Sequence, residues 1–360
     1  MVSVRAVDIS KKFGNFQALD HVSIEAKDKE LVTLLGPSGC GKTTTLRIIA
    51  GLIEPDTGRV YFGDQDVTDI PSHKRNIGFV FQKIALFPHM NVYKNIAFGL
   101  KMRKVPKEEI DKRVKEVLKL VGMEGFENRM PTQLSGGQAQ RIEIARVLAT
   151  DPDVLLLDEP LGHLDAKLRE SLKYEIRRIQ RETGKTAIFV THDQAEAFAI
   201  SDRIYVMSNG KVEQVGSPIE LYLSPRSEFV AEFIGISNFL DGKILEISDK
   251  RLIIEAENGL SLISNEMPNI DEYSENERVL ISIRPEDIEF IQSIQENNKY
   301  NVFEGVIDEA TFLGDTTRLL VTFGSKVMKV HEYGPERFNL LKLKGKKALF
   351  QIKRFSIVKK

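Results

Sequence analysis

A glycine-rich run near the N-terminus has the residue types and spacing of a phosphate-binding loop. It follows an apolar run at residues 31–35 and precedes a helical pattern. Small residues let successive backbone N–H groups surround phosphate oxygens, and the start of a helix adds positive potential. Lys42 is spaced to reach the terminal phosphates, and the Thr43 hydroxyl is spaced to bind Mg²⁺. The residues predicted to bind ATP phosphates are Gly36, Pro37, Ser38, Gly39, Cys40, Gly41, Lys42, Thr43 and Thr44.

Two adjacent acids follow a second apolar run, at residues 153–157. Two carboxylates at the end of a buried strand are costly unless a cation and its chemistry use them. We therefore expect Asp158 to orient Mg²⁺ and Glu159 to act as the general base that polarises the attacking water. The alternative is a solvated acidic turn, which the phosphate-binding loop in the same chain disfavours.

The elements that position these residues are predicted from periodicity. Apolar runs at 31–35, 153–157 and 186–190 are typical of parallel strands buried on both faces. Helices are predicted over 107–121 and from an Asp165 cap to Gly184, and Asn209 with Gly210 predicts a hairpin. The order of these elements indicates an α/β domain that carries a helical subdomain at about 88–150.

The composition changes at about residue 235. Beyond it, seven short β-branched segments alternate with Gly, Asn and Asp, and no helical pattern is evident. This favours a small barrel or sandwich, so residues 1–235 are expected to form a nucleotide-binding domain and residues 236–360 a β-rich domain.

The overall composition excludes several classes of protein. The 360 residues are 42% hydrophobic and 29% charged, with a formal net charge of -1, which argues against disorder and against a global attraction to nucleic acid. The single cysteine, Cys40, cannot form an intramolecular disulfide. The N-terminus lacks the apolar run of a signal peptide, and no apolar run reaches the ~20 residues that span a bilayer. A cytosolic compartment is expected.

A second motif makes a resemblance specific. Five residues, followed by a helix with Arg141 and Arg146, resemble the signature motif of ATP-binding-cassette (ABC) ATPases: Leu134, Ser135, Gly136, Gly137 and Gln138. Ser135 can cap a helix whose first N–H groups the glycines expose, which suits a γ-phosphate. The resemblance implies a head-to-tail dimer with two ATPs, in which this helix end acts in trans. It also implies a P-loop ABC fold with a helical subdomain, followed by an all-β OB-like (TOBE) barrel.

The remaining motifs of the family appear in order. The resemblance implies that Phe13 stacks on adenine, that Gln82 contacts Mg²⁺ and the attacking water, and that His192 contacts the γ-phosphate. For Phe13, a place in the core is the alternative. The resemblance also implies that Asp165 lies in the loop that crosses the dimer interface.

The sequence departs from the family pattern at four positions: Gly162 and His163 replace a common Ser-Ala pair, Ala139 replaces a frequent Gln, and Glu143 replaces a small apolar residue.

Two further stretches resemble the importer branch of the family, which includes carbohydrate, polyamine and inorganic-ion systems. Leu86, Phe87, Pro88 and Met90 resemble the groove that receives the coupling helix of a membrane subunit, although they could also form the subdomain's own core. Residues 233–240, 283–288 and 311–316 resemble the OB-type accessory domain.

The implied function is an ATPase subunit that energises solute import. The implied partners are a second copy, membrane permease subunits and, indirectly, a solute-binding protein, but no nucleic acid. The implied location is peripheral, on the cytoplasmic face of the membrane.

The alternatives to an importer ATPase are other ABC ATPases. Repair ATPases of the family contain a long coiled coil and ribosome-associated ones carry two cassettes, and this sequence shows neither feature. Exporter ATPases usually lack the C-terminal β domain that is expected here. Among solutes, residues 233–240 and 312–316 are closer to the polyamine or ion type than to the sugar type. The C-terminal domain could bind a regulator or the solute. Cys40 is expected to be a small tolerated residue, with a redox role as the alternative because a helix N-terminus lowers a thiol pKa.

Overall fold

The computed structural model describes residues 2–248, 251–264, 273–293, 300–335 and 337–358. The chain forms two compact units, Met1–Pro218 and Ile219–Lys360. Two short helices, α7 (Pro218–Leu223) and α8 (Glu228–Phe233), lie between that division and the composition change at about residue 235. α8 belongs to the second unit because Ala231 packs with Leu280 and Val358.

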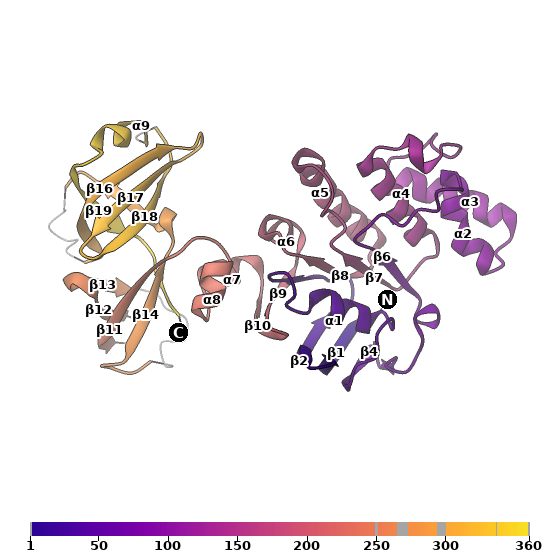
Figure 1. Ribbon diagram of the computed structural model, residues 1–360, viewed down its shortest axis with the longest axis horizontal. Coiled ribbons are helices and arrows are strands. Elements are labelled where there is room, and N and C mark those ends of the chain that lie inside the picture. Colours follow the sequence, from indigo (N-terminus) through magenta and orange to yellow (C-terminus); the bar gives the residue numbers. More distant parts are fainter. Residues whose placement is uncertain (1, 249–250, 265–272, 294–299, 336, 359–360) are drawn as a thin grey trace. The chain divides into compact units, whose positions relative to one another are not determined.

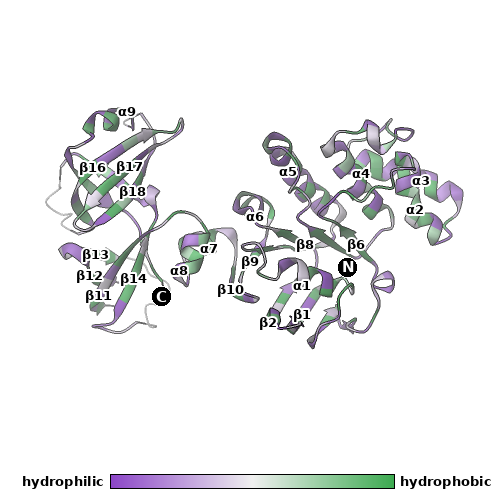
Figure 2. Cartoon of the chain, in the orientation of Figure 1, coloured by the Kyte–Doolittle hydropathy of each residue, from purple (hydrophilic) through white to green (hydrophobic). Residues whose placement is uncertain are grey.

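The first unit contains a six-stranded sheet, in the order β10-β9-β3-β8-β7-β6 (Figure 1). β3, β6, β7, β8 and β9 pair in parallel, and β10 closes one edge as an antiparallel hairpin partner of β9. Figure 2 shows β8 in mainly hydrophobic colours, and all its residues are buried. Every residue of β3 and β7 is buried as well. The prediction of parallel strands buried on both faces is confirmed. The strand bounds are Leu31–Leu35 (β3), Ile77–Val80 (β6), Val154–Asp158 (β7), Thr186–Thr191 (β8), Arg203–Ser208 (β9) and Lys211–Gly216 (β10).

A second, antiparallel sheet of the first unit was not anticipated by the periodicity of the sequence. Its order is β2-β1-β4-β5, with bounds Phe16–Ala26, Val4–Phe13, Thr57–Phe62 and Gln65–Asp66. Inward residues such as Ile9 and Leu19 share a hydrophobic core with Leu46 of α1 (Lys42–Ile49) and with Leu34 of β3. This sheet therefore helps to fix the helix that follows the phosphate-binding loop.

The helices begin and end at residues with recognisable capping roles. α5 (Ala166–Thr183) begins at Asp165, whose side chain accepts a hydrogen bond from Leu168 N, and ends at Gly184 with φ 61°. Asn209 and Gly210 turn between β9 and β10 with φ 47° and 77°. These predicted boundaries are confirmed because each depends on local backbone chemistry. The remaining helices of this unit are α2 (Val92–Met102), α3 (Lys107–Leu120), α4 (Gly136–Ala149) and α6 (Gln194–Ile200).

The second unit consists mainly of two antiparallel sheets, in the orders β13-β12-β11-β14-β20 and β15-β19-β16-β17-β18. Residues from both sheets, including Ile254, Ile281, Val321 and Phe350, share one core. All seven expected strands are present, as β11 (Asn238–Ser248), β12 (Arg251–Ala256), β14 (Arg278–Ile283), β16 (Val302–Phe312), β17 (Thr317–Phe323), β18 (Lys326–Glu332) and β19 (Lys347–Ile352).

Three short strands and one short α-helix among the described residues beyond 235 were not predicted from the sequence. They are β13 (Leu260–Ser264), β15 (Ile288–Ile291), β20 (Ser356–Val358) and α9 (Arg337–Leu340). The expectation that no helix occurs beyond about residue 235 is therefore wrong. α9 was not predicted because it is too short to show a periodic pattern. Within the described residues, no helix is long and apolar enough to cross a membrane.

Candidate active site

The phosphate-binding loop joins β3 to α1, and its glycines are required by close contacts. A Cβ added at Gly36 would lie 2.3 Å from Met207 O, and one at Gly41 would lie 2.7 Å from Ala18 O. Gly41 also has φ 104° at the N-cap of α1. Larger residues at these two positions would therefore displace the neighbouring backbone.

Lys42 turns back into its own loop. The side chain is 4% exposed, and Nζ donates to the carbonyl oxygens of Gly36 and Pro37 at 2.8 Å each. These hydrogen bonds hold the ammonium group inside the curve of the loop. Phosphate oxygens that entered the loop would be charged acceptors for the same group.

Thr43 and Asp158 come together although 115 positions separate them in sequence. Thr43 Oγ1 donates to Asp158 Oδ1 at 2.8 Å, and Arg47 lies 4.0 Å from the other carboxylate oxygen. Burial raises the pKa of the Asp158 carboxyl above its ordinary value, and the hydrogen bond from Thr43 opposes this shift. Arg47 was not singled out in the sequence, although it lies one helical turn beyond Thr43 on the same helix.

Glu159 has a strained backbone and two polar neighbours. Its φ is 44°, an uncommon value for a residue with a side chain, and its N–H donates to Val190 O of β8 at 3.1 Å. Gln82 Nε2 donates to Glu159 Oε2 at 3.1 Å, and His192 Nδ1 lies 3.4 Å from the same oxygen. The structure thus brings together three residues that the sequence singled out separately.

The sequence-predicted signature lies at the N-terminus of α4. Ser135 accepts a hydrogen bond from Gln138 N at 3.4 Å, and Gln138 Oε1 accepts one from Ser135 N at 2.9 Å. This reciprocal capping box confirms that Ser135 caps a helix. Ser135 and Gly136 are exposed, while Leu134 and Gln138 are partly buried. A Cβ at Gly137 would meet the Leu168 side chain at 2.6 Å, so close packing explains this glycine.

Asp165 is exposed and caps α5, just after the unusual pair Gly162 and His163. Gly162 N donates to Glu159 O at 3.2 Å, which ties this loop to the acidic residue. Arg169, which was not singled out in the sequence, donates to Leu164 O at 3.0 Å and lies 3.7 Å from the Asp193 carboxylate. Arg169 could have been noticed in the sequence because it lies four residues after the predicted helix cap Asp165, a spacing that places two side chains side by side on a helix. Arg169 therefore links the Asp165 loop to the segment that carries His192.

The residues of the expected docking groove differ in exposure. Pro88 is exposed, Leu86 packs partly against the core of the helical subdomain, and Met90 is partly buried. The Phe87 ring lies 4.6 Å from that of Phe98. Asn95 is fully buried, and its side chain bonds to the Phe87 N–H and to carbonyl oxygens of this segment. Asn95 was not singled out in the sequence, and it fixes the backbone of the segment.

Phe13 and Cys40 differ in their surroundings. Phe13 ends β1 and is 48% exposed, so it does not lie in the core. Cys40 is 3% exposed, and burial raises the pKa of its thiol. The alternative of a redox role depended on a thiol pKa lowered by the helix N-terminus, and the structure does not favour it, because desolvation outweighs the favourable charge of Lys42.

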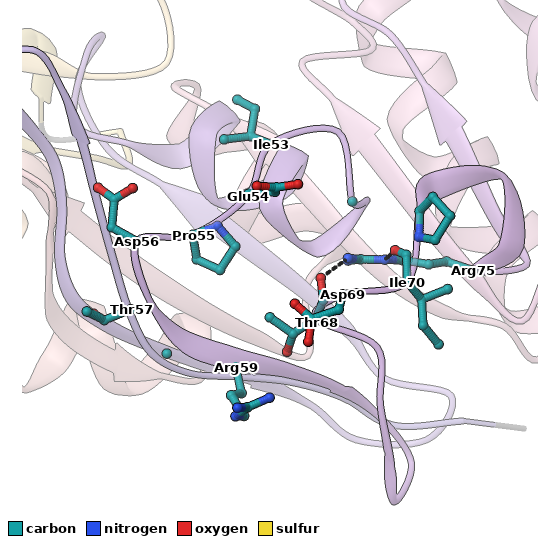
Figure 3. Close-up of a pocket in the computed structure, with 13 residues that line it drawn as sticks. Ile53, Glu54, Pro55, Asp56, Thr57, Arg59, Thr68, Asp69, Ile70 and Arg75 are labelled. Atoms are coloured by element: carbon teal, nitrogen blue, oxygen red, sulfur yellow. Dashed lines mark hydrogen bonds between the residues drawn. The ribbon is translucent and has the colours of Figure 1, made fainter.

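A cavity of about 430 Å³ lies apart from these residues, beside β4. Figure 3 shows Arg75 directed into its wall, where it bonds to Thr68 O and Ile70 O. The same guanidinium donates to Ile48 O and Ile49 O at the end of α1. Arg75 is therefore used in capping α1, and we assign the cavity no part in the chemistry.

The described residues contain no cluster of three or more His, Cys, Asp or Glu side chains that could hold a metal ion alone. The paired oxygens of Thr43 and Asp158 nevertheless suit Mg²⁺, which is commonly bound by one or two protein ligands together with substrate phosphates.

Segments of both units match known protein families. Residues 19–162 match the ABC transporter family, and residues 281–338 match the TOBE domain. The chain is 46% identical over 328 residues to the spermidine/putrescine import ATP-binding protein PotA of Clostridioides difficile, covering 90% of this chain and 91% of that protein. It is 43% identical over 335 residues to the protein of the same name from Thermotoga maritima, covering 90% and 88%.

Solved structures match about three fifths of the chain. The protein cbiO1 from Clostridium perfringens, part of the ABC transporter complex cbiONQ, is 32% identical with a TM-score of 0.57, covering 61% of this chain and 89% of that one. The ATP-binding cassette MJ0796, solved as a dimer in a post-hydrolysis state with ADP and Pi, is 36% identical with a TM-score of 0.53, covering 59% and 98%.

Proposed function

Because the chain belongs to the ATP-binding subunits of ABC transporters and carries a TOBE domain, we propose that it hydrolyses ATP to drive the import of polyamines. The ATPase activity and the role in import follow from the family. The solute class, the residue roles, the metal and the partners are our proposals.

The observation that carries the catalytic proposal is the position of the Glu159 carboxylate. It lies within 3.1 Å of the Gln82 amide and 3.4 Å of the His192 ring, directly after Asp158. A carboxylate in this place can accept a proton from water while Gln82 orients that water. His192 then stabilises the charge that develops on the γ-phosphate. Lys42 and the backbone N–H groups of the phosphate-binding loop hold the other phosphates.

Thr43 and Asp158, whose side-chain oxygens are paired, would hold Mg²⁺ together with Gln82. When bound, Mg²⁺ neutralises phosphate charge and polarises the γ-phosphoryl group. Asp158 also keeps the Thr43 hydroxyl oriented through their hydrogen bond. Phe13, exposed at the end of β1, supplies an aromatic face for adenine.

The dimer proposal rests on the capped N-terminus of α4. Ser135 and Gly136 are exposed, so the helix end that suits a γ-phosphate is free to meet another chain. A head-to-tail pair would place this end over the partner's phosphate-binding loop, with Asp165 in the shared loop. The related cassette MJ0796 was solved as a dimer, which supports this proposal.

The transport proposal joins the ATP site to a membrane partner. Leu86, Phe87, Pro88 and Met90 follow Gln82 closely in the chain, so a shift at one end of this segment is transmitted to the other. Coupling helices of the permease subunits would bind there and hold the chain peripherally on the cytoplasmic face of the membrane. Relatives that align with 90% of this chain at 43% and 46% identity are named import ATP-binding proteins, which favours import over repair or export.

The experiment is uptake into proteoliposomes that contain this chain and its permease subunits, with the solute-binding protein outside and ATP inside. We expect spermidine or putrescine uptake that requires internal ATP, and no uptake of maltose or ferric ion. ATP hydrolysis without uptake of either polyamine would overturn the assigned solute. Absence of any ATP hydrolysis would overturn the function itself.

A further inference from the structure

Glu143 departs from the family pattern and is fully buried in α4. Burial raises the pKa of its carboxyl to about 7. A buried acid is costly, so its surroundings indicate what it is used for. Glu143 lies two helical turns beyond the N-terminus of α4, in the same rigid element as the signature residues.

Both backbone groups of one residue, Ala85, are held by α4. Ala85 N–H donates to Glu143 Oε1 at 3.2 Å, and Arg146 donates to Ala85 O at 2.7 Å. The Arg146 guanidinium also lies 5.3 Å from the centre of the Phe87 ring and 3.9 Å from Glu143 Oε1. Residues 143 and 146 lie one turn apart on α4, so from one helix face they bind the two peptide groups on either side of the Ala85 Cα.

Ala85 lies between the two ends of the segment 82–90. Gln82, three residues before it, contacts Glu159, and the proposed docking residues begin immediately after it. The segment has no helix or strand of its own between β6 and α2. Hydrogen bonds to α4 and to Asn95 therefore supply much of its order.

We propose that Glu143 is a positioning residue that, together with Arg146, locks the segment 82–90 to the signature helix. A membrane subunit that pushes on the docking residues then moves the signature end of α4 and Gln82 as one unit. An alanine at this position could not hold the Ala85 N–H, so the coupling would be looser. This inference rests on the proposed function for its transport readout, but the contact itself is tested without transport.

The first test is hydrogen–deuterium exchange on the full chain. In Glu143→Ala, we expect the Ala85 amide to exchange about tenfold faster, which corresponds to one lost hydrogen bond, while the amides of β7 and β8 are unchanged. Glu143→Gln keeps an acceptor oxygen and should stay within about threefold of the unsubstituted chain. Glu124→Ala, on an exposed loop, is the control. Equal exchange at Ala85 in all variants would overturn the contact.

The second test is the number of ATP molecules hydrolysed per solute imported in proteoliposomes. Glu143→Ala should raise this ratio by roughly threefold or more, while hydrolysis by the chain without permease stays within about twofold. Glu143→Gln should restore the ratio. A ratio unchanged in Glu143→Ala, or raised equally in both variants, would overturn the positioning role. If the unsubstituted chain neither hydrolyses ATP nor imports, the proposed function fails, and the exchange result still decides whether the contact exists.

Discussion

The Gln82 side-chain amide donates a hydrogen bond to Glu159 Oε2 at 3.1 Å, across 77 positions of sequence. Gln82 follows the edge strand β6, and Glu159 follows its neighbour β7. Because the two strands are parallel, their carboxyl ends meet at one edge of the sheet. The residue that is proposed to take a proton from water is thereby connected to the segment that is proposed to contact the membrane subunit.

Gln82→Ala removes this connection and leaves the phosphate-binding loop intact. We expect nucleotide affinity to fall by no more than about threefold, since Lys42, Thr43 and Asp158 remain, and hydrolysis by the isolated chain to fall by no more than about tenfold, since the proposed base remains. Stimulation of hydrolysis by the permease subunits should be lost. Phosphate release with and without permease checks this, with Gln65→Ala on exposed β5 as the control. Full stimulation in Gln82→Ala would contradict the assigned link.

Lys42→Ala should weaken nucleotide binding itself. The ammonium group is buried inside the loop, where its charge-assisted hydrogen bonds to phosphate oxygens would be worth about 1.5–3 kcal/mol. We therefore expect ATP affinity to fall roughly tenfold to a hundredfold, measured by calorimetry. The control is Lys107→Ala, at the exposed start of α3. Unchanged affinity would show that Lys42 does not reach the phosphates.

Cys40 should react slowly with alkylating agents. Its thiol is buried and its pKa is raised, so less of the reactive thiolate is present at neutral pH than in a free cysteine. We expect alkylation by iodoacetamide at pH 7.5 to be at least about tenfold slower than that of a free thiol, and to speed up above pH 9. Alkylation should block hydrolysis, and bound ATP should protect the thiol. Rapid modification at pH 7 would contradict this account.

Glu143 should make stability depend on pH. Its folded pKa of about 7 lies above the ordinary value of 4.5, so the folded chain binds the proton more tightly than the unfolded chain. The stabilisation from protonated Glu143 is complete below about pH 4.5 and is lost as pH rises through about 7. At 1.36 kcal/mol for each pKa unit, the loss amounts to about 3 kcal/mol at most.

Thermal unfolding measured from pH 5 to pH 8 checks this prediction. The melting temperature of Glu143→Gln, relative to that of the unsubstituted chain, should rise with pH across this range, because the amide does not titrate. A difference that does not vary with pH would show that Glu143 has an ordinary pKa.

Features that depend on neighbouring residues could be predicted from the sequence. The start of α5 at Asp165 and its end at Gly184 follow from local capping, and the Asn209–Gly210 turn follows from residues that tolerate positive φ. The phosphate-binding loop could be placed because its flanking strand and helix both have clear periodicity.

Features that depend on distant residues could not be predicted. The contact of Glu143 with Ala85 spans 58 positions, and no local rule specifies such a pairing. The link from Arg169 to Asp193 joins α5 to the loop before α6 in the same way. For Cys40, the local rule and the tertiary environment oppose each other, and burial raises the thiol pKa despite the adjacent helix N-terminus.

The rate of phosphate release by Glu159→Gln, measured beside its ATP affinity, tests the central claim most directly. We predict that ATP binding is retained, that a closed dimer accumulates, and that hydrolysis falls by at least about a hundredfold, because the amide cannot accept the proton from water. Glu124→Gln, on an exposed loop, should hydrolyse ATP at the normal rate. Near-normal hydrolysis by Glu159→Gln would contradict the account of this site.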